Sequence, residues 1–215
     1  MTVVRLPEPC LVVLVGAAGS GKTTLARRCF EPEAILSSDA YRGLVSGDET
    51  NQAVTKVAFR LLHRDLAKRL RARRTAVVDA TNVTAFARRS LVRRAAAAGV
   101  PAVAVVLALD PLLVRSRNAT RPGRIVPEDA VLRQLGDLAR SVRRGFDAEG
   151  FGQVILVREP AELDALTFEA PGQPGEADPP AMSMMAAAAA PIPRARLGVI
   201  LSWRTVAARI TVTTG

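Results

Sequence analysis

The sequence predicts an α/β fold in which a mostly parallel sheet carries helices on both faces. Short apolar runs alternate along the chain with longer segments of helical character, and a glycine-rich turn joins the first apolar run to the first helix. This alternation is typical of parallel sheets, because the chain must cross back over the sheet between two parallel strands and usually does so through a helix. At 215 residues the chain is long enough for one such domain with a substantial core and a short appendage.

The predicted elements follow one another from residue 11 onward. Strands are expected at 11–15, 34–36, 76–78, 102–109 and 153–157. Helices are expected at 23–30, 50–73, 85–98, 111–118 and 128–144. Ligands of such sheets bind at the carboxyl ends of the strands, so the residues that directly follow the strands should converge on one crevice. These residues are Gly16, Ser38, Asp39, Asp79 and Asp110.

The turn at residues 16–23, GAAGSGKT, matches the pattern G-x-x-x-x-G-K-[ST] of a phosphate-binding loop. The glycines let backbone N–H groups curl around phosphate oxygens, the lysine reaches the terminal phosphates, and the threonine hydroxyl can bind Mg²⁺. The N-terminal end of the next helix adds its positive dipole. We therefore expect a P-loop nucleoside triphosphate hydrolase fold that binds ATP and Mg²⁺. The predicted nucleotide-binding residues are Gly16, Gly19, Ser20, Gly21, Lys22, Thr23 and Thr24.

A carboxylate at the end of the second predicted strand is expected to face the terminal phosphate. Asp39, in the segment SSDAYR, could take the proton from an acceptor hydroxyl during phosphoryl transfer. Arg42 falls three residues later on the same face of a helical turn and could clamp a phosphate of the acceptor. The alternative for Asp39 is that it caps a helix, which is a common use of aspartate.

The segment VVDATN at residues 77–82 repeats this arrangement of polar groups after a buried strand. Asp79 could hold Mg²⁺ through water, and with Thr23 it forms the predicted metal site. Asn82 could also act in the site. Alternatively, Thr81 and Asn82 could cap the helix that follows.

Arginines cluster at residues 114–124, where a helix runs into a Pro-Gly loop, and this pattern predicts an arginine-rich mobile lid. Arginines on a lid can close over the triphosphate and stabilise charge on the transferred group. Arg117, Arg121 and Arg124 lie on one side if the segment is helical. A solvated basic helix face is the alternative. The residues predicted to act in catalysis are Lys22, Asp39, Arg42, Arg117, Arg121 and Arg124.

The composition limits the kinds of function that we expect for this protein. The chain has 30 Lys and Arg against 20 Asp and Glu, a formal net charge of +10, which favours polyanionic partners; an arginine-rich coding bias is the alternative. The two cysteines have no metal-like spacing, and the single histidine, His63, gives no reason to expect His-dependent chemistry. No secretion signal or bilayer-spanning apolar run occurs, so we expect a cytoplasmic protein without a membrane partner.

The character of the sequence changes after about Phe168. Proline- and glycine-rich residues lead there into a low-complexity Met/Ala run. We therefore expect a P-loop kinase domain over residues 1–168 and a linker-like, poorly ordered tail over residues 169–215.

Together these motifs resemble the N-terminal kinase domain of the bacterial polynucleotide kinase-phosphatase family, P-loop kinases of AAA-like ATPase type that act in RNA repair. The similarity covers most of residues 10–168 and is carried by segments 16–23, 37–46, 77–83 and 117–121. It implies transfer of the ATP γ-phosphate to the 5′-hydroxyl end of RNA or DNA. It also implies ATP and Mg²⁺ contacts for Lys22 and Thr23, the general base for Asp39, a contact to the acceptor's 3′-side phosphate for Arg42, and phosphate clamps for Arg117 and Arg124.

The sequence departs from this family in one respect. Members with this name continue into a metallophosphatase domain and often a ligase module, and neither pattern follows Phe168, so we expect neither activity. Two other functions stay open: a kinase of a small-molecule alcohol, which would need no basic surface along a nucleic-acid backbone, and a non-catalytic ATP- or RNA-binding module. Tyr41 is the candidate for stacking on the terminal base of a nucleic acid.

Overall fold

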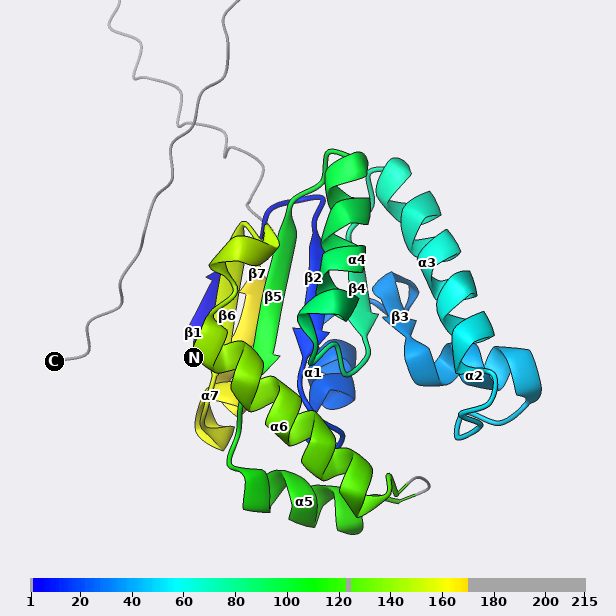
Figure 1. Cartoon of the computed structure of the whole chain (residues 1–215). Coiled ribbons are helices and arrows are strands. Elements are labelled where there is room, and N and C mark those ends of the chain that lie inside the picture. Colours follow the sequence, from blue (N-terminus) through cyan, green and yellow to red (C-terminus); the bar gives the residue numbers. More distant parts are fainter. Residues whose placement is uncertain (1, 123–124, 170–215) are drawn as a thin grey trace, which may run out of the picture. The chain divides into compact units, whose positions relative to one another are not determined.

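A five-stranded parallel sheet forms the centre of the computed structural model, which describes residues 2–122 and 125–169 (Figure 1). Its strands are β2 Leu11–Val15, β3 Ile35–Ser37, β4 Ala76–Asp79, β5 Ala102–Leu107 and β6 Gln153–Val157. They lie in the order β3-β4-β2-β5-β6, and each neighbouring pair is parallel. The predicted α/β fold with a parallel sheet is confirmed.

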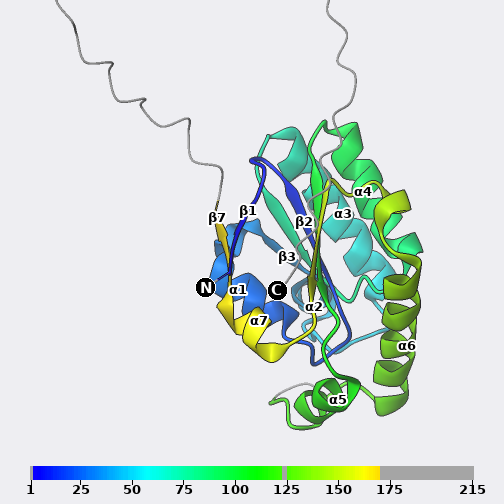
Figure 2. The same cartoon turned by 90° about the vertical axis from the view of Figure 1, so that its left-hand side faces the viewer.

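Helices cover both faces of this sheet, as Figure 2 shows. They are α1 Lys22–Cys29, α2 Ser38–Ser46, α3 Thr55–Arg71, α4 Ala85–Ala97, α5 Pro111–Ala119, α6 Glu128–Arg144 and α7 Pro160–Ala165. Successive side chains of a strand point to opposite faces. In β2, Val13 and Val15 therefore join the core under α3 and α4, while Val12 and Leu14 join the core under α1. Because β2 is the middle strand of the sheet, the loop that follows it lies at the centre of the sheet.

A second, two-stranded sheet was not predicted from the sequence. Strand β1, Thr2–Arg5, pairs in parallel with β7, Leu166–Glu169, and the pair lies on the same side of the main sheet as α1 and α7 (Figure 2). Most residues of β1 are exposed, so its four residues carry no clear apolar pattern. Strand β7 directly follows α7, which packs against β6 of the main sheet. The pairing of β7 with β1 therefore fixes the chain just after α7.

The region between β3 and α3 differs from the predicted long helix over 50–73. Helix α2 ends at Gly47, which has a φ of 73° in the left-handed region, and α3 begins only at Thr55. In the connection between them, Asp48 Oδ1 accepts a 2.7 Å hydrogen bond from the Thr50 N–H, and Asn51 Oδ1 accepts a 3.0 Å bond from the Ala53 N–H. These side-chain bonds offer the backbone an alternative to helix, and the resulting connection borders the site.

The predicted tail over residues 169–215 lies outside the described residues, except for Glu169 at the end of β7. Among the helices of the described ranges, none combines the length and the apolar character that a membrane crossing requires.

Candidate nucleotide-binding site

The phosphate-binding loop, residues 16–23, joins β2 to α1 at the centre of the sheet. Gly19 and Gly21 have φ angles of 86° and 93°, which are strained for residues with a side chain. A β-carbon on Gly19 would also come within 2.5 Å of the Val114 carbonyl oxygen in α5. Glycine is therefore required at position 19 both for the turn and for the close approach of α5.

Lys22 is 8% exposed and lies under this loop. Its Nζ donates hydrogen bonds to the Ala17 carbonyl oxygen at 2.8 Å and to Ser20 Oγ at 3.4 Å. Burial lowers the pKa of Lys22 to about 8; nearby Asp79 opposes this shift, and Arg121 adds to it. A buried ammonium group with another cation beside it is an arrangement that suits an anionic ligand.

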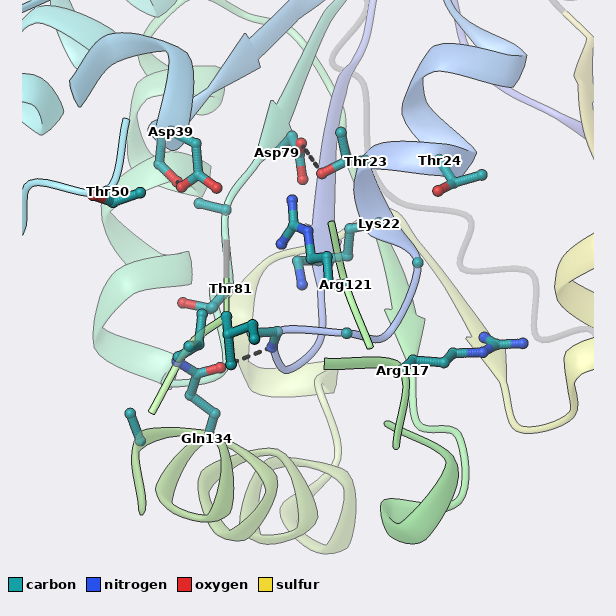
Figure 3. Close-up of a pocket in the computed structure, with 18 of the residues that line it drawn as sticks. Lys22, Thr23, Thr24, Asp39, Thr50, Asp79, Thr81, Arg117, Arg121 and Gln134 are labelled. Atoms are coloured by element: carbon teal, nitrogen blue, oxygen red, sulfur yellow. Dashed lines mark hydrogen bonds between the residues drawn. The ribbon is translucent and has the colours of Figure 1, made fainter. Parts of the chain in front are cut away.

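Thr23 and Asp79 form a pair of oxygen groups beside Lys22. Thr23 Oγ1 donates a 2.8 Å hydrogen bond to Asp79 Oδ2, and Asp79 is 4% exposed at the end of β4 (Figure 3). Mg²⁺ prefers hard oxygen ligands and usually keeps several waters, so these two side chains fit it as partial ligands. No group of three or more His, Cys, Asp or Glu that could enclose a metal is found within residues 2–122 and 125–169. A Mg²⁺ ion here would need phosphate oxygens and water to complete its shell.

Gln134 is a loop contact that the sequence reasoning missed. Its Oε1 accepts a 2.8 Å hydrogen bond from the Ala18 N–H, which ties α6 to the phosphate-binding loop (Figure 3). The signal was present, because Gln134 follows the buried Val131 by three residues and precedes the buried Leu138 by four. A polar residue on the buried stripe of an amphipathic helix needs a partner inside the protein.

The strand-end segment after β4 supports the loop from the other side. The Gly16 N–H donates a 2.9 Å bond to the Thr81 carbonyl oxygen, and Asn82 Nδ2 donates a 2.9 Å bond to the Leu14 carbonyl oxygen. Asn82 is buried with a φ of 47°. The capping alternative is wrong for both residues, because the N-cap of α4 is Thr84, whose Oγ1 accepts a hydrogen bond from the Ala87 N–H.

Asp39 and Arg42 form an ion pair at the start of α2, between Asp39 Oδ1 and Arg42 Nη2. The structure thus confirms that the two side chains share one face of a helical turn. Arg42 is 5% exposed, and its Nε donates a 2.9 Å bond to the Glu49 carbonyl oxygen. Asp39 is not the cap of α2, since Ser37 occupies that position. Its carboxylate is instead fixed in orientation by Arg42.

Tyr41 does not line the site. Its hydroxyl donates a 2.9 Å bond to Asp65 Oδ2, and its ring packs against the core under α3. Burial and the hydrogen bond to Asp65 both raise the pKa of the Tyr41 phenol. The aromatic side chain that borders the site is Phe59, in the first turns of α3.

The predicted lid is only partly helical. Helix α5 ends at Ala119, so Arg121 follows the helix instead of continuing its face. In Figure 3, Arg121 extends toward Lys22 and Asp79, whereas Arg117 extends away from them toward the side of Thr24. Arg124 lies outside the described residues.

Two contacts fix the base of the lid. Arg115 turns away to pair with Glu128 at the start of α6. The buried Asn118 donates from Nδ2 to the Val126 carbonyl oxygen at 2.8 Å and accepts from the Val126 N–H at 3.2 Å. These bonds close the loop between α5 and α6, so Asn118 holds the two ends of the lid together.

A cavity of about 1100 Å³ joins these groups. Its lining includes Gly19, Gly21, Lys22, Thr23, Thr24, Asp39, Arg42, Asp79, Arg117 and Arg121. Gly16 and the fully buried Ser20 do not line it and instead shape the loop from beneath. Asp110, which was expected in the crevice, caps α5 by accepting bonds from the Leu112 and Leu113 N–H groups. In Figure 3, Asp39 and Thr50 lie on one side of Lys22 and Asp79, and Thr24 and Arg117 lie on the other.

The parallel sheet, the loop at its central strand and the buried lysine beside a Thr–Asp pair define a nucleotide-binding P-loop fold. The chain belongs to the AAA domain family, which matches residues 11–144. No curated protein matches the sequence.

Solved structures are similar in fold. The Pnkp1/Rnl/Hen1 RNA repair complex contains a chain that is 20% identical, with a TM-score of 0.56; the match covers 65% of the present chain and 47% of that chain. A putative kinase from Chloroflexus aurantiacus is 17% identical with a TM-score of 0.54, covering 74% and 91% of the two chains. A structure of the PezAT toxin-antitoxin system of Streptococcus pneumoniae is 16% identical with a TM-score of 0.54, covering 70% and 67%. The present chain thus spans about half the length of the RNA repair protein, and the similarity concerns the fold.

Proposed function

We propose that this chain is an ATP- and Mg²⁺-dependent kinase of 5′-hydroxyl ends of RNA or DNA. The observation that carries the proposal is that Asp39 borders the same cavity as Lys22 and the Thr23–Asp79 pair. A carboxylate placed across from a phosphate-binding loop has a clear use in phosphoryl transfer to an alcohol, because the acceptor hydroxyl must lose a proton. A protein that only binds ATP needs no such group.

The proposed reaction places each group at a defined step. Asp39 accepts the proton of the 5′-hydroxyl while the hydroxyl oxygen forms a bond to the γ-phosphorus. The bond from that phosphorus to the oxygen that bridges the β- and γ-phosphates breaks, and ADP is released. Lys22 and Arg121 balance the negative charge of the transferred group. Thr23 and, through water, Asp79 would hold Mg²⁺, which when bound would supply further neutralisation of the phosphate charge. Arg42 orients Asp39 and contacts a phosphate of the acceptor strand.

Surface charge supports a polynucleotide acceptor over a small alcohol. Basic residues at four-residue spacing, Lys56, Arg60 and Arg64, are exposed on α3, whose first turns border the cavity through Phe59. Arg89 and Arg93 are exposed on the neighbouring α4. A small-molecule kinase has no need of such a surface, while the phosphates of a nucleic-acid strand would be attracted to it.

The test is transfer of label from [γ-³²P]ATP to a 5′-hydroxyl oligonucleotide in the presence of Mg²⁺. We expect the wild-type protein to label RNA or DNA with a free 5′-hydroxyl and to leave a 5′-phosphorylated oligonucleotide unlabelled. Asp39→Ala and Asp39→Asn should abolish labelling while ATP binding persists. Asp147→Ala, an exposed carboxylate outside the cavity, is the matched control and should label like the wild type.

Three other outcomes would change the assignment. ATP binding without labelling of any oligonucleotide, but with label transferred to a sugar or another small alcohol, would assign a small-molecule kinase. Binding of both ATP and oligonucleotide without transfer would assign a binding module. Labelling that survives in Asp39→Asn would support the kinase activity and show that Asp39 is not its general base.

A further inference from the structure

The cavity has a lobe on the Asp39 side, in which the proposed phosphoryl transfer uses only Asp39 and Arg42. We define this acceptor lobe by the cavity-lining residues of α2, of α3 and of the connection between them. These residues are Ser38, Asp39, Arg42, Thr50, Gln52, Thr55 and Phe59. Asp39 is the carboxylate of the lobe, and Phe59 is the only aromatic residue among the described cavity-lining residues. Arg42 is paired with Asp39, and the other members of the set are polar and uncharged.

Phe59 is held in place on the side that faces the protein. Its ring is partly buried and packs against the core beneath α3. The ring of His63, one helical turn further along α3, meets it edge-on, with the centroids 5.9 Å apart and the planes at 70°. His63 is uncharged near neutral pH, because burial and the nearby Arg94 lower its pKa to about 4. The ring of Phe59 is therefore fixed from behind, while part of its surface borders the cavity.

We infer that Phe59 is the stacking platform for the terminal base of the acceptor strand, an inference that rests on the proposed polynucleotide kinase function. The 5′-hydroxyl and the terminal base belong to one nucleotide, so a hydroxyl at Asp39 brings its own base into the acceptor lobe. An aromatic face binds any base, because every base has a π-face. The hydroxyl groups of Thr50 and Thr55 can donate or accept equally well, so the lobe takes a 5′-terminal nucleotide without selecting its base.

Binding of an oligonucleotide with 2-aminopurine at its 5′ end, free of any 5′ phosphate, tests the inference. The fluorescence of 2-aminopurine falls when the base stacks on an aromatic ring, and the readout needs no catalysis. We expect the wild-type chain of 215 residues to quench this fluorescence on binding. Phe59→Leu should lose the quenching and bind about 5- to 150-fold more weakly, the range expected for one base–aromatic stack. Phe59→Trp should keep both the quenching and the wild-type affinity for the oligonucleotide.

Two controls separate stacking from a folding effect. Phe86→Leu removes a ring that is 83% exposed on α4 and outside the cavity, and it should behave like the wild type. An oligonucleotide that lacks its 5′-terminal base should bind the wild-type protein as weakly as the complete oligonucleotide binds Phe59→Leu. This second measurement uses only the wild-type chain and stands even if Phe59→Leu fails to fold.

The outcomes distinguish this inference from the function on which it rests. Equal quenching by the wild type and Phe59→Leu, or no loss of affinity for the oligonucleotide without its terminal base, would overturn the stacking role. Label transfer that persists in that case would leave the kinase proposal intact. Quenching that depends on Phe59 without any label transfer would support the stacking role and reject the kinase. A wild-type protein that binds no oligonucleotide would reject both.

Discussion

The hydroxyl of Thr23 donates a 2.8 Å hydrogen bond to Asp79 Oδ2, which joins the first turn of α1 to the carboxyl end of β4. We predict that Asp79→Asn lowers kcat for phosphoryl transfer by about 10- to 100-fold, the usual effect of losing an outer-shell metal partner. The Mg²⁺ concentration for half-maximal rate should rise as well. Initial rates measured across a Mg²⁺ titration check this, with Thr23→Ser as the variant that should keep the wild-type profile. An unchanged Mg²⁺ dependence in Asp79→Asn would place the metal elsewhere.

The two described lid arginines should have different effects on the kinetics. Arg121 extends toward Lys22, so Arg121→Ala should lower kcat by about 10³-fold, as loss of an arginine that stabilises transition-state charge does. Arg117 extends toward the Thr24 side, so Arg117→Ala should mainly raise the KM for ATP. Arg115→Ala is the control, because Arg115 pairs with Glu128 instead. Steady-state kinetics with varied ATP measure all three, and equal kcat values for Arg121→Ala and Arg115→Ala would contradict the assignment.

Gln134 should matter for nucleotide affinity although its helix, α6, is distant from the phosphate-binding loop in the sequence. Gln134→Leu leaves the Ala18 N–H without its acceptor, which costs about 1 kcal/mol and corresponds to roughly fivefold weaker ATP binding if the loop loses its preformed shape. Titration calorimetry with ATP measures the affinity. Arg140→Leu, an exposed position on the same helix, should leave it unchanged. Equal affinities in both variants would show that Gln134 does not shape the loop.

Sequence reasoning could predict the parts of the site that depend on local pattern or on the rule that parallel strands end at one edge. The phosphate-binding loop is contiguous, and its glycines and lysine have fixed chemical reasons at fixed spacing. Asp39 and Asp79 were expected in one crevice because each follows a strand, and both border the cavity. Asp110 obeys the same rule, but its side chain is used by the N-terminus of α5.

Other parts of the site could not be predicted because they depend on contacts between distant residues. The bond from Ala18 to Gln134 spans 116 residues, so the helical pattern can indicate that Gln134 needs a partner inside the protein but not that the partner is Ala18. Arg121 was placed on a helix face by its spacing, but α5 ends at Ala119. Tyr41 and Phe59 are both aromatic residues near the acceptor side, and only packing decides that Tyr41 turns to Asp65 while Phe59 borders the cavity.

A buried ion pair ties α4 to the 3-10 turn after α6. The side chain of Arg88 is 0% exposed; its Nε and Nη2 donate to Glu149 at 2.7 and 2.6 Å, and its guanidinium also bonds to Ser141 Oγ and the Asn82 carbonyl oxygen. Glu149→Ala leaves the arginine charge buried without its partner, so we predict a loss of about 3–5 kcal/mol in the free energy of unfolding. Urea denaturation measures this loss.

The control for the Arg88 prediction is an exposed pair. Asp129→Ala breaks the solvent-exposed pair with Arg133 and should leave the free energy of unfolding essentially unchanged. The double variant Arg88→Leu/Glu149→Leu should be less destabilised than Glu149→Ala, because it leaves no buried charge unpaired. If the double variant loses as much free energy of unfolding as Arg88→Leu and Glu149→Leu lose in sum when measured singly, packing and not the buried charge sets the cost.

His63 should make the stability of the protein depend on pH between about 6.5 and 4. Burial and Arg94 lower the pKa of His63 from 6.5 to about 4, so in this range the unfolded chain binds the proton while the folded chain does not. The free energy of unfolding must therefore fall as the pH drops through this window, by roughly 1–2 kcal/mol for a half-buried ring. Urea denaturation at pH 7.0 and 4.5 should show a smaller loss in His63→Gln than in the wild type. Arg94→Gln should also reduce the loss, because it removes the cation that opposes protonation; an equal loss in all three proteins would show that other groups set the pH dependence.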